Sequence, residues 1–186
     1  MFDNWNKYCG NANISAWEME ALCFYYHEHE LAHINLEKYG ISNFKDLPNE
    51  PEVDYYFHRK NANIPIYKID KIVGTCIAKN KNKSNISLLT KDGVVTVKFR
   101  KEYFALFDKQ ISQLQENGKK KVIEKSWFKR GNMLMVQGIK RDDNFIAKKY
   151  ARTPGHQLYK IISIDDNGDI VLQGERNQGD YEESED

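Results

Sequence analysis

The sequence predicts a mainly β protein with some helix, organised around one small barrel between residues 64 and 150. Three observations predict this fold. Short apolar runs are separated by basic loops, an Asp-Gly pair marks a hairpin between the second and third runs, and one helical segment follows the third run. The runs are residues 67–78, 85–90, 94–99, 133–140 and 145–150. Five strands with a helix between the third and the fourth is the order of a five-stranded Greek-key barrel of the OB-fold type.

Residues 1–57 are expected to form a helical N-terminal extension and a linker. Ser15 and Glu18 have the capping-box spacing, which predicts a helix over about 16–27. A second short helical stretch is expected to end at Gly40. Residues 41–63 contain Pro48 and Pro51 and predict a linker without a packed regular element, because proline removes a donor and fixes the backbone.

Residues 58–157 are expected to form the barrel domain. Its first strand, 66–78, is long enough to bend and pair on both sides, with Gly74 as the candidate bend. A basic turn follows at 79–85, and alternating apolar residues on either side of Asp92-Gly93 predict that strands two and three form a hairpin.

A helix is predicted over residues 100–117, because five apolar residues share one helical stripe. They are Tyr103, Phe104, Phe107, Ile111 and Leu114. Strands four and five then flank a turn at 142–144, and residues 158–176 predict a further β-hairpin around Asn167-Gly168. The acidic residues 177–186 are expected to be disordered.

The composition indicates a globular protein with enough apolar residues, 40%, to bury a core. No run approaches the roughly 20 apolar residues of a membrane helix, and residues 1–10 lack the features of a signal peptide, so we expect a cytoplasmic protein. Cys9, Cys23 and Cys76 have no paired spacing and are interpreted as reduced packing residues. No cofactor and no metal are expected.

The net charge of +1 conceals a strong asymmetry along the chain. Residues 1–57 carry 3 basic and 10 acidic residues, residues 58–160 carry 24 and 8, and residues 161–186 carry 1 and 9. The middle therefore has a charge of +16 between ends of −7 and −8. Such a distribution is typical of a module that binds a polyanion. The alternative is a lysine-rich solvated surface that serves solubility.

We predict that single-stranded DNA crosses strands two and three, between the loop after strand one and the loop between strands four and five. Lysines would contact phosphates there and aromatic rings would stack on bases. For Trp127 and Phe128, packing in the core is the alternative. The predicted DNA-binding residues are Lys79, Lys81, Lys83, Lys98, Arg100, Trp127, Phe128, Lys129, Arg130, Lys140, Arg141 and Lys148.

A zinc hydrolase is a weaker hypothesis. Residues 29–33 read His29-Glu30-Leu31-Ala32-His33, the pattern in which two histidines one helical turn apart bind zinc and the glutamate activates water. The pattern fixes only three positions, so chance matches are common, and the favoured interpretation is an amphipathic helix with two partly exposed histidines. Two adjacent carboxylate pairs, at 142–143 and 165–166, lie in predicted turns, where Asp is an ordinary turn residue.

Two parts of the sequence resemble the alpha subunit of bacterial DNA polymerase III. Before its OB domain, that family carries a helix reading Glu-x-Glu-x-Leu-Gly-Phe-Tyr-x-Ser-x-His-Pro-Leu. Residues 18–31 match it at seven positions, namely Glu18, Glu20, Leu22, Phe24, Tyr25, His29 and Leu31. Cys23, His27 and Glu30 differ from the family's Gly, Ser and Pro, which implies a distant member, of phage origin.

The second part is similar to the family's OB region. Residues 72–75 precede a lysine-rich turn, residues 92–99 end in an apolar residue and Phe99, and residues 133–138 end in Gly138. The resemblance covers about residues 15–150. It also implies that Glu30 creates the zinc pattern by accident, because His29 falls on the family's His-Pro position.

The resemblance implies a non-catalytic piece of a replicase that lies on the template side. The family's catalytic aspartates belong to a palm domain, to which nothing in this sequence corresponds. The expected partners are therefore template single-stranded DNA and the remaining polymerase domains or other replisome proteins, with no membrane. The alternative function is a protein-interaction module that docks its acidic ends on a basic partner in a replication complex.

Overall fold

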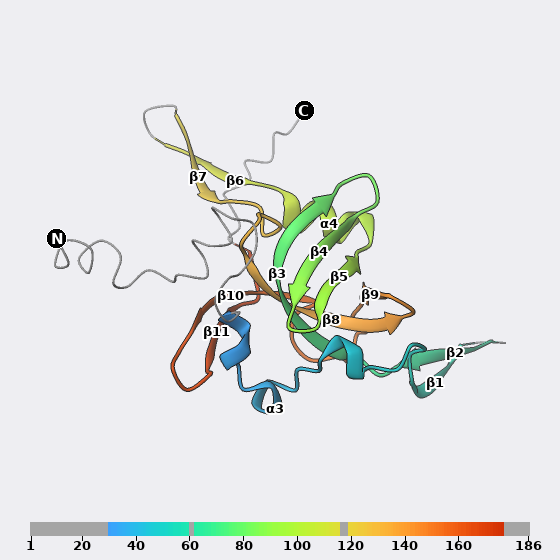
Figure 1. Cartoon of the computed structure of the whole chain (residues 1–186). Helices are drawn as coiled ribbons and strands as arrows, with labels where there is room; N and C mark the ends of the chain where they lie inside the picture. The colour runs from blue at the N-terminus through green and yellow to red at the C-terminus, as the bar shows by residue number, and fades with distance from the viewer. Residues whose placement is uncertain (1–29, 60–61, 116–118, 177–186) are drawn as a thin grey trace, which may run out of the picture.

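A closed five-stranded barrel forms the centre of the protein (Figure 1). The computed structural model describes residues 30–59, 62–115 and 119–176. The barrel strands are β3 (Asp70–Asn80), β4 (Asn85–Thr90), β5 (Gly93–Lys98), β8 (Met133–Arg141) and β9 (Asn144–Ala147). They pair in the order β3-β4-β5-β9-β8 and return to β3, with β5 and β9 parallel and every other pair antiparallel. This is the predicted OB-type Greek-key barrel, and the prediction is confirmed.

Strand β8 closes the barrel because both of its edges are used. One edge pairs with β3, from Asp70 opposite Gly138 to Thr75 opposite Met133. The other edge pairs first with β10 (Leu158–Ile164) and then with β9. Strand β11 (Ile170–Gln173) adds to β10, so the predicted C-terminal hairpin is confirmed and extends the barrel sheet to seven strands.

The barrel core follows the alternation of β4 and β5. Ile86 and Leu88 of β4 and Val95 and Val97 of β5 are buried, while the residues between them are partly or fully exposed. Helix α4 (Lys101–Asp108) packs against this core through two buried phenylalanines. Cys76 also lies in the core, where burial raises the pKa of its thiol to about 12, so it is a packing residue as predicted.

The residues before the barrel form short helical turns over a second apolar cluster. The turns are η1 (Glu30–His33), α3 (Leu36–Tyr39) and η2 (Phe44–Asp46). Leu31, Ile34 and Ile41 pack with Met135 of β8 and with residues of β10 and β11. Gly40 ends α3 in the left-handed conformation, at φ 60°, as predicted. The helix predicted over 16–27 lies outside the described residues. None of the described helices has the length and apolar character needed to cross a membrane.

The prediction of a linker over residues 41–63 is wrong. Strands β1 (Val53–Arg59) and β2 (Ala62–Tyr67) form an antiparallel two-stranded ribbon there. Every residue of β1 is exposed, so the ribbon lacks the buried face whose apolar alternation would have predicted strands. Pro65 is tolerated because a two-stranded ribbon leaves the outer edge of each strand unpaired.

The predicted helix over residues 100–117 is too long. Helix α4 ends at Asp108, where Lys109 is extended at φ −65° and ψ 136°, and β6 (Ile111–Leu114) then pairs with β7 (Lys120–Glu124). Of the predicted stripe, only Phe104 and Phe107 belong to the barrel core. Ile111 is buried, whereas Leu114, three residues later, is 60% exposed, which fits a strand with two unlike faces.

We predict that replacing Gly138 by alanine destabilises the barrel by ~3 kcal/mol or more. A Cβ at this position would lie 2.1 Å from the carbonyl oxygen of Ile146, at the point where β9 passes β8. Gly131→Ala is the matched control, because open space surrounds that glycine and only its positive φ of 87° opposes the change, at a cost of about 1–2 kcal/mol. Urea unfolding of both variants checks this, and equal losses would contradict it.

Candidate nucleic-acid interface

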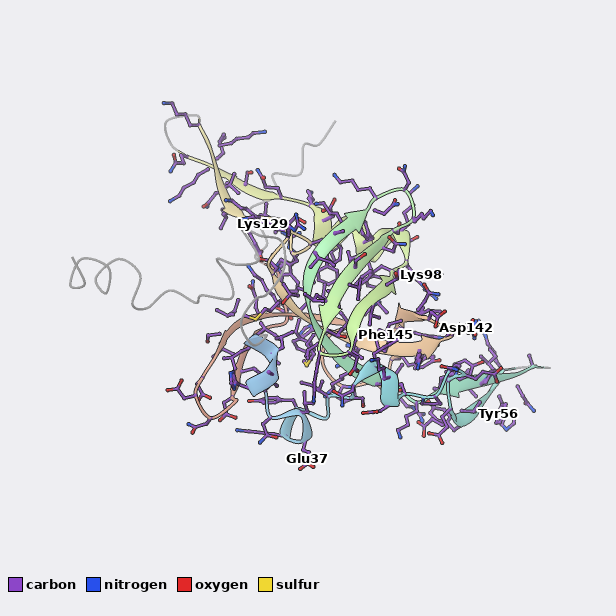
Figure 2. All side chains as sticks on the ribbon, in the orientation of Figure 1. Glu37, Tyr56, Lys98, Lys129, Asp142 and Phe145 are labelled. Atoms are coloured by element: carbon purple, nitrogen blue, oxygen red, sulfur yellow. The ribbon has the colours of Figure 1, made fainter. Side chains whose placement is uncertain are left out.

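The outer face of β4 and β5 carries one charged side chain, Lys98. The outward side chains are Asn85, Ser87, Leu89, Val94, Thr96 and Lys98. None is aromatic and none is acidic. A nucleic-acid strand could therefore lie across this face with Lys98 beside its phosphates (Figure 2). The same face offers no ring on which a base could stack.

The turn between β3 and β4 lies next to this face and carries Lys81 and Lys83, and Lys79 precedes it at the end of β3. Residues 81–84 form the turn, in which Asn80 Oδ1 accepts the backbone N–H of Lys83 at 3.1 Å. The backbone N–H of Phe99 donates to Ser84 O at 2.9 Å and ties the turn to the end of β5. The side chain of Lys83 is exposed and makes no ion pair within the described part of the chain.

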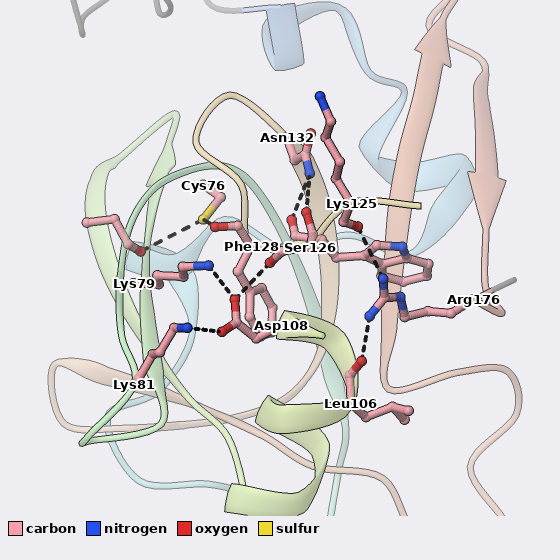
Figure 3. Close-up of polar contacts among 12 residues, drawn as sticks. Cys76, Lys79, Lys81, Leu106, Asp108, Lys125, Ser126, Phe128, Asn132 and Arg176 are labelled. Carbon is pink, nitrogen blue, oxygen red and sulfur yellow. Dashed lines mark hydrogen bonds and ion pairs between the residues drawn. The ribbon is translucent and has the colours of Figure 1, made fainter. Parts of the chain in front are cut away.

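Lys79 and Lys81 are already paired with Asp108 at the end of α4 (Figure 3). Lys79 Nζ contacts Asp108 Oδ1, and Lys81 Nζ lies 3.3 Å from Oδ2. Ser126 Oγ donates to the same carboxylate at 2.8 Å. A negative charge at a helix C-terminus is unfavourable, because that end of the helix dipole is itself negative. The two lysines offset this and fasten the turn to the helix.

The electrostatics of Asp108 follow from these contacts. Burial raises the pKa of this carboxyl, but hydrogen bonds from Lys79, Ser126 and Lys81 outweigh it and hold the pKa below its ordinary value. Asp108 is therefore ionised at neutral pH and competes with any phosphate for the two lysines. The turn and the end of β3 therefore offer less free positive charge than their three lysines suggest.

Two aromatic residues that were predicted as stacking groups are buried. Trp127 and Phe128 are 0% and 2% exposed. The Trp127 ring stacks on Phe107 with centroids 5.1 Å apart, and its indole N–H donates to Glu124. Phe128 packs against Phe99 and neighbouring rings of the core. Stacking on a base requires an exposed ring face, so the structure supports the alternative, core packing, for both residues.

Lys140 is also buried, at 7% exposure, and is not available to a phosphate. Its ammonium donates to Leu47 O at 2.7 Å and lies 4.7 Å from the centre of the Phe44 ring. The hydrogen bond and the cation–π contact explain how a lysine can be buried without a carboxylate partner. Lys140 therefore fastens the segment before the ribbon to the barrel, and its prediction as a DNA-binding residue is corrected.

The other predicted residues are distributed over two sides of the barrel. Lys98 and Arg100 are exposed where β5 leads into α4, and Arg141 is exposed at the turn between β8 and β9. Lys129 and Arg130 are exposed in the turn before β8, and Figure 2 shows Lys129 on the other side of the barrel from Lys98. The structure therefore does not bring all the predicted charges to one surface.

Lys148 is half-buried in an aromatic site that the sequence did not predict. Its ammonium lies 5.3 Å from the centre of the Tyr67 ring and 4.8 Å from that of Tyr150. The hydroxyl of Tyr150 accepts the backbone N–H of Tyr67 at 3.1 Å, which links the barrel to the end of β2. Two lysines followed by Tyr150 were visible in the sequence at 148–150, but Tyr67 joins them only through the fold.

The ribbon β1–β2 carries further exposed aromatic residues. Tyr55, Tyr56 and Phe57 are 37%, 57% and 49% exposed. Three consecutive aromatic residues were the available signal in the sequence, but they lie in a segment that was interpreted as a linker. Aromatic residues that could meet a base are therefore found on the ribbon and not on the barrel face.

The C-terminal segment is fastened by a buried arginine. Arg176 donates to Leu106 O at 2.6 Å and to Lys125 O at 3.1 Å, and its Nε lies 3.7 Å from Glu124 Oε2 (Figure 3). A hollow of about 800 Å³ lies beside it, between α4, residues 149–157 and residues 174–176. The contacts hold residues 174–176 against α4 and the end of β7.

The zinc hypothesis finds no site in the described residues. His29 lies outside them, and His33 is exposed at the end of η1. Within residues 30–59, 62–115 and 119–176, no three His, Cys, Asp or Glu side chains come together as a metal site.

Comparison with known proteins identifies relatives among DNA polymerases. The chain is 39% identical over 177 residues to a protein of Bacillus subtilis (strain 168) described as "Probable DNA polymerase YorL". It has the same identity over the same length to a "DNA-directed DNA polymerase" of Bacillus phage SPbeta. In both cases the match covers 95% of this chain and 14% of the relative. No family model and no solved structure matches. The chain is thus similar, over nearly its whole length, to a small section of two proteins described as DNA polymerases.

Proposed function

We propose that this chain is a single-stranded DNA-binding OB domain of a DNA polymerase III alpha-like replicase. In this proposal it performs no reaction itself and holds the template strand by phosphate contacts and base stacking. One observation carries the proposal. The closed barrel has a face on β4 and β5 without acidic or aromatic side chains, with Lys98 at its end and the lysine-bearing β3–β4 turn beside it. OB barrels bind single strands on this face.

The similarity to two proteins described as DNA polymerases supports the choice of DNA as the ligand. Because the chain spans 14% of their length, polymerase activity itself is assigned to other parts of such a replicase. The residues proposed to contact phosphates are exposed or half-buried: Lys79, Lys81, Lys83, Lys98, Arg100, Arg141 and Lys148. Lys129 and Arg130 would serve a strand that continues around the barrel.

Fluorescence anisotropy of a labelled oligo-dT at two salt concentrations tests the proposal. Neutralising phosphates releases counterions, so the affinity should fall steeply as salt rises. Lys98→Ala should lower the slope of log K against log salt by roughly 0.7, the value for one contact on a single strand. Lys38→Ala is the control, because that exposed lysine lies on α3 and pairs with Asp169. If the wild-type protein does not bind single strands even at low salt, the proposed function is wrong.

We also predict that Asp108→Asn binds single-stranded DNA more tightly, by roughly threefold to tenfold at low salt. The amide keeps a group of the same shape beside Ser126 but releases Lys79 and Lys81 to meet phosphates. Asp169→Asn is the matched control, because it removes the same charge from another lysine–aspartate pair. This pair, Lys38 and Asp169, lies on the side of the second apolar cluster. Unchanged or weaker binding by a folded Asp108→Asn protein would show that the turn does not contact DNA.

A further inference from the structure

The ribbon β1–β2 carries Tyr55, Tyr56 and Phe57, which are all exposed in the part of the chain that the structure describes. Both of its faces are open, and Tyr56 is the most exposed aromatic residue in the described part of the chain, at 57%. Two-stranded ribbons are marginally stable by themselves, and exposed apolar patches of this kind mark interaction sites. The ribbon therefore requires both an anchor and a partner.

The anchor is the end of the barrel at the β8–β9 turn. The backbone N–H of Asp142 in that turn donates to Asn49 O at 2.9 Å, and Lys140 of β8 donates to Leu47 O at 2.7 Å. Tyr67 at the end of β2 is bonded to Tyr150. Both strands of the ribbon are thus fixed at their base, and the ribbon projects from the barrel beside this turn (Figures 1 and 2).

The β8–β9 turn itself is poorly suited to bind a nucleic acid. OB barrels use the loop between strands four and five to flank the bound strand. Here that loop is a tight turn at Asp142 and Asp143, two exposed acidic residues that would repel a phosphate. The ribbon projects beside this turn, where a longer loop would otherwise reach over the bound nucleic-acid strand.

The two faces of the ribbon differ in their side chains. Tyr56 pairs with Pro65 and His58 pairs with Asn63, so these residues share one face, and alternation along β2 places Tyr67 on it too. The other face carries Tyr55 and Phe57, which pair with Ile66 and Ile64. One face is thus aromatic and polar, while the other is aromatic and aliphatic.

The aromatic and polar face continues the proposed DNA-binding surface. Lys98 at the end of β5 pairs with Ile146 of β9, and Lys148 follows two residues later on the same side. The ammonium of Lys148 lies against the ring of Tyr67, from which the face leads to Tyr56. Basic and aromatic groups therefore follow one another from the barrel to the ribbon, and Asp54, two residues before Tyr56, is the one acidic residue in the described part of the ribbon.

We propose that the Tyr56 face of the ribbon takes the place of the long strand-four-to-five loop and stacks on bases of the single strand that crosses the barrel. This proposal rests on the proposed function and adds the missing stacking surface. The ligand is inferred from charge, because beyond Asp54 the described part of the ribbon has no acidic residue and carries His58 and Arg59. A nucleic acid, rather than an acidic or neutral peptide, supplies both the phosphates and the flat rings for such a surface.

The test compares neighbouring tyrosines on opposite faces. Tyr56→Ala should weaken binding of labelled oligo-dT by roughly fivefold or more, which is the loss of one stacked base. Tyr55→Ala, the matched control, should change it by less than about twofold, a difference under ~0.4 kcal/mol. Both side chains are exposed and lie in the same strand, so any effect on folding should be similar. Photocrosslinking with iododeoxyuridine in the oligonucleotide should label Tyr56 and not Tyr55.

The outcomes separate this proposal from the function on which it rests. If the wild type binds and Lys98→Ala weakens binding, but Tyr56→Ala binds normally, the barrel binds DNA and the ribbon does not. Equal losses in both tyrosine variants, with no crosslink to Tyr56, would also overturn the proposal, because binding would then not depend on stacking against the Tyr56 face. If the wild type binds no single strand, the proposed function fails and this inference fails with it.

Discussion

The parallel pairing of β5 with β9 is the interaction on which the rest of the structure depends. It closes the barrel, because β9 also pairs with β8, and β8 returns to β3. Closure requires the backbone of β9 to pass directly over Gly138, where no side chain fits. Closure pairs the edges of the five central strands with one another. Only the first part of β8 keeps an unpaired edge within the barrel, and β10 pairs with that edge. The DNA-binding face, the anchored ribbon and the C-terminal hairpin all take their positions from this arrangement.

Local pairing decides how much of the chain's positive charge is available at the surface. The middle segment carries a net charge of +16, but Lys140 is buried against Leu47 and Phe44, and Lys79 and Lys81 are shared with Asp108. These lysines stabilise the contacts between turns and helix that shape the interface. Fewer charges are free for phosphates than the sequence implies, and we expect moderate affinity that depends strongly on salt.

Elements with one buried face could be predicted from the sequence. The alternating runs of β4 and β5 indicated two strands, and each of these strands buries one face. Apolar runs also indicated strands β8 and β10, and these strands are confirmed. The ribbon was missed because neither of its faces is buried, so its sequence has no alternation. The sequence could not decide between base stacking and core packing for Trp127 and Phe128. Aromatic residues between lysines have the same pattern in both cases. Only the rings contributed by α4 and by the end of β5 decide between the two.

The pairing of Lys148 with Tyr67 could not be inferred either, since it joins residues 81 positions apart through the fold.

The most direct test of the account is an NMR titration of the ¹⁵N-labelled protein with a short oligo-dT. We predict that amide shifts change along β4, β5, β9, the β3–β4 turn and the ribbon, while β10, β11 and α3 are unaffected. Shifts confined to β10 and β11, or none at saturating DNA, would contradict the central claim that this barrel binds a single strand on its β4–β5 face.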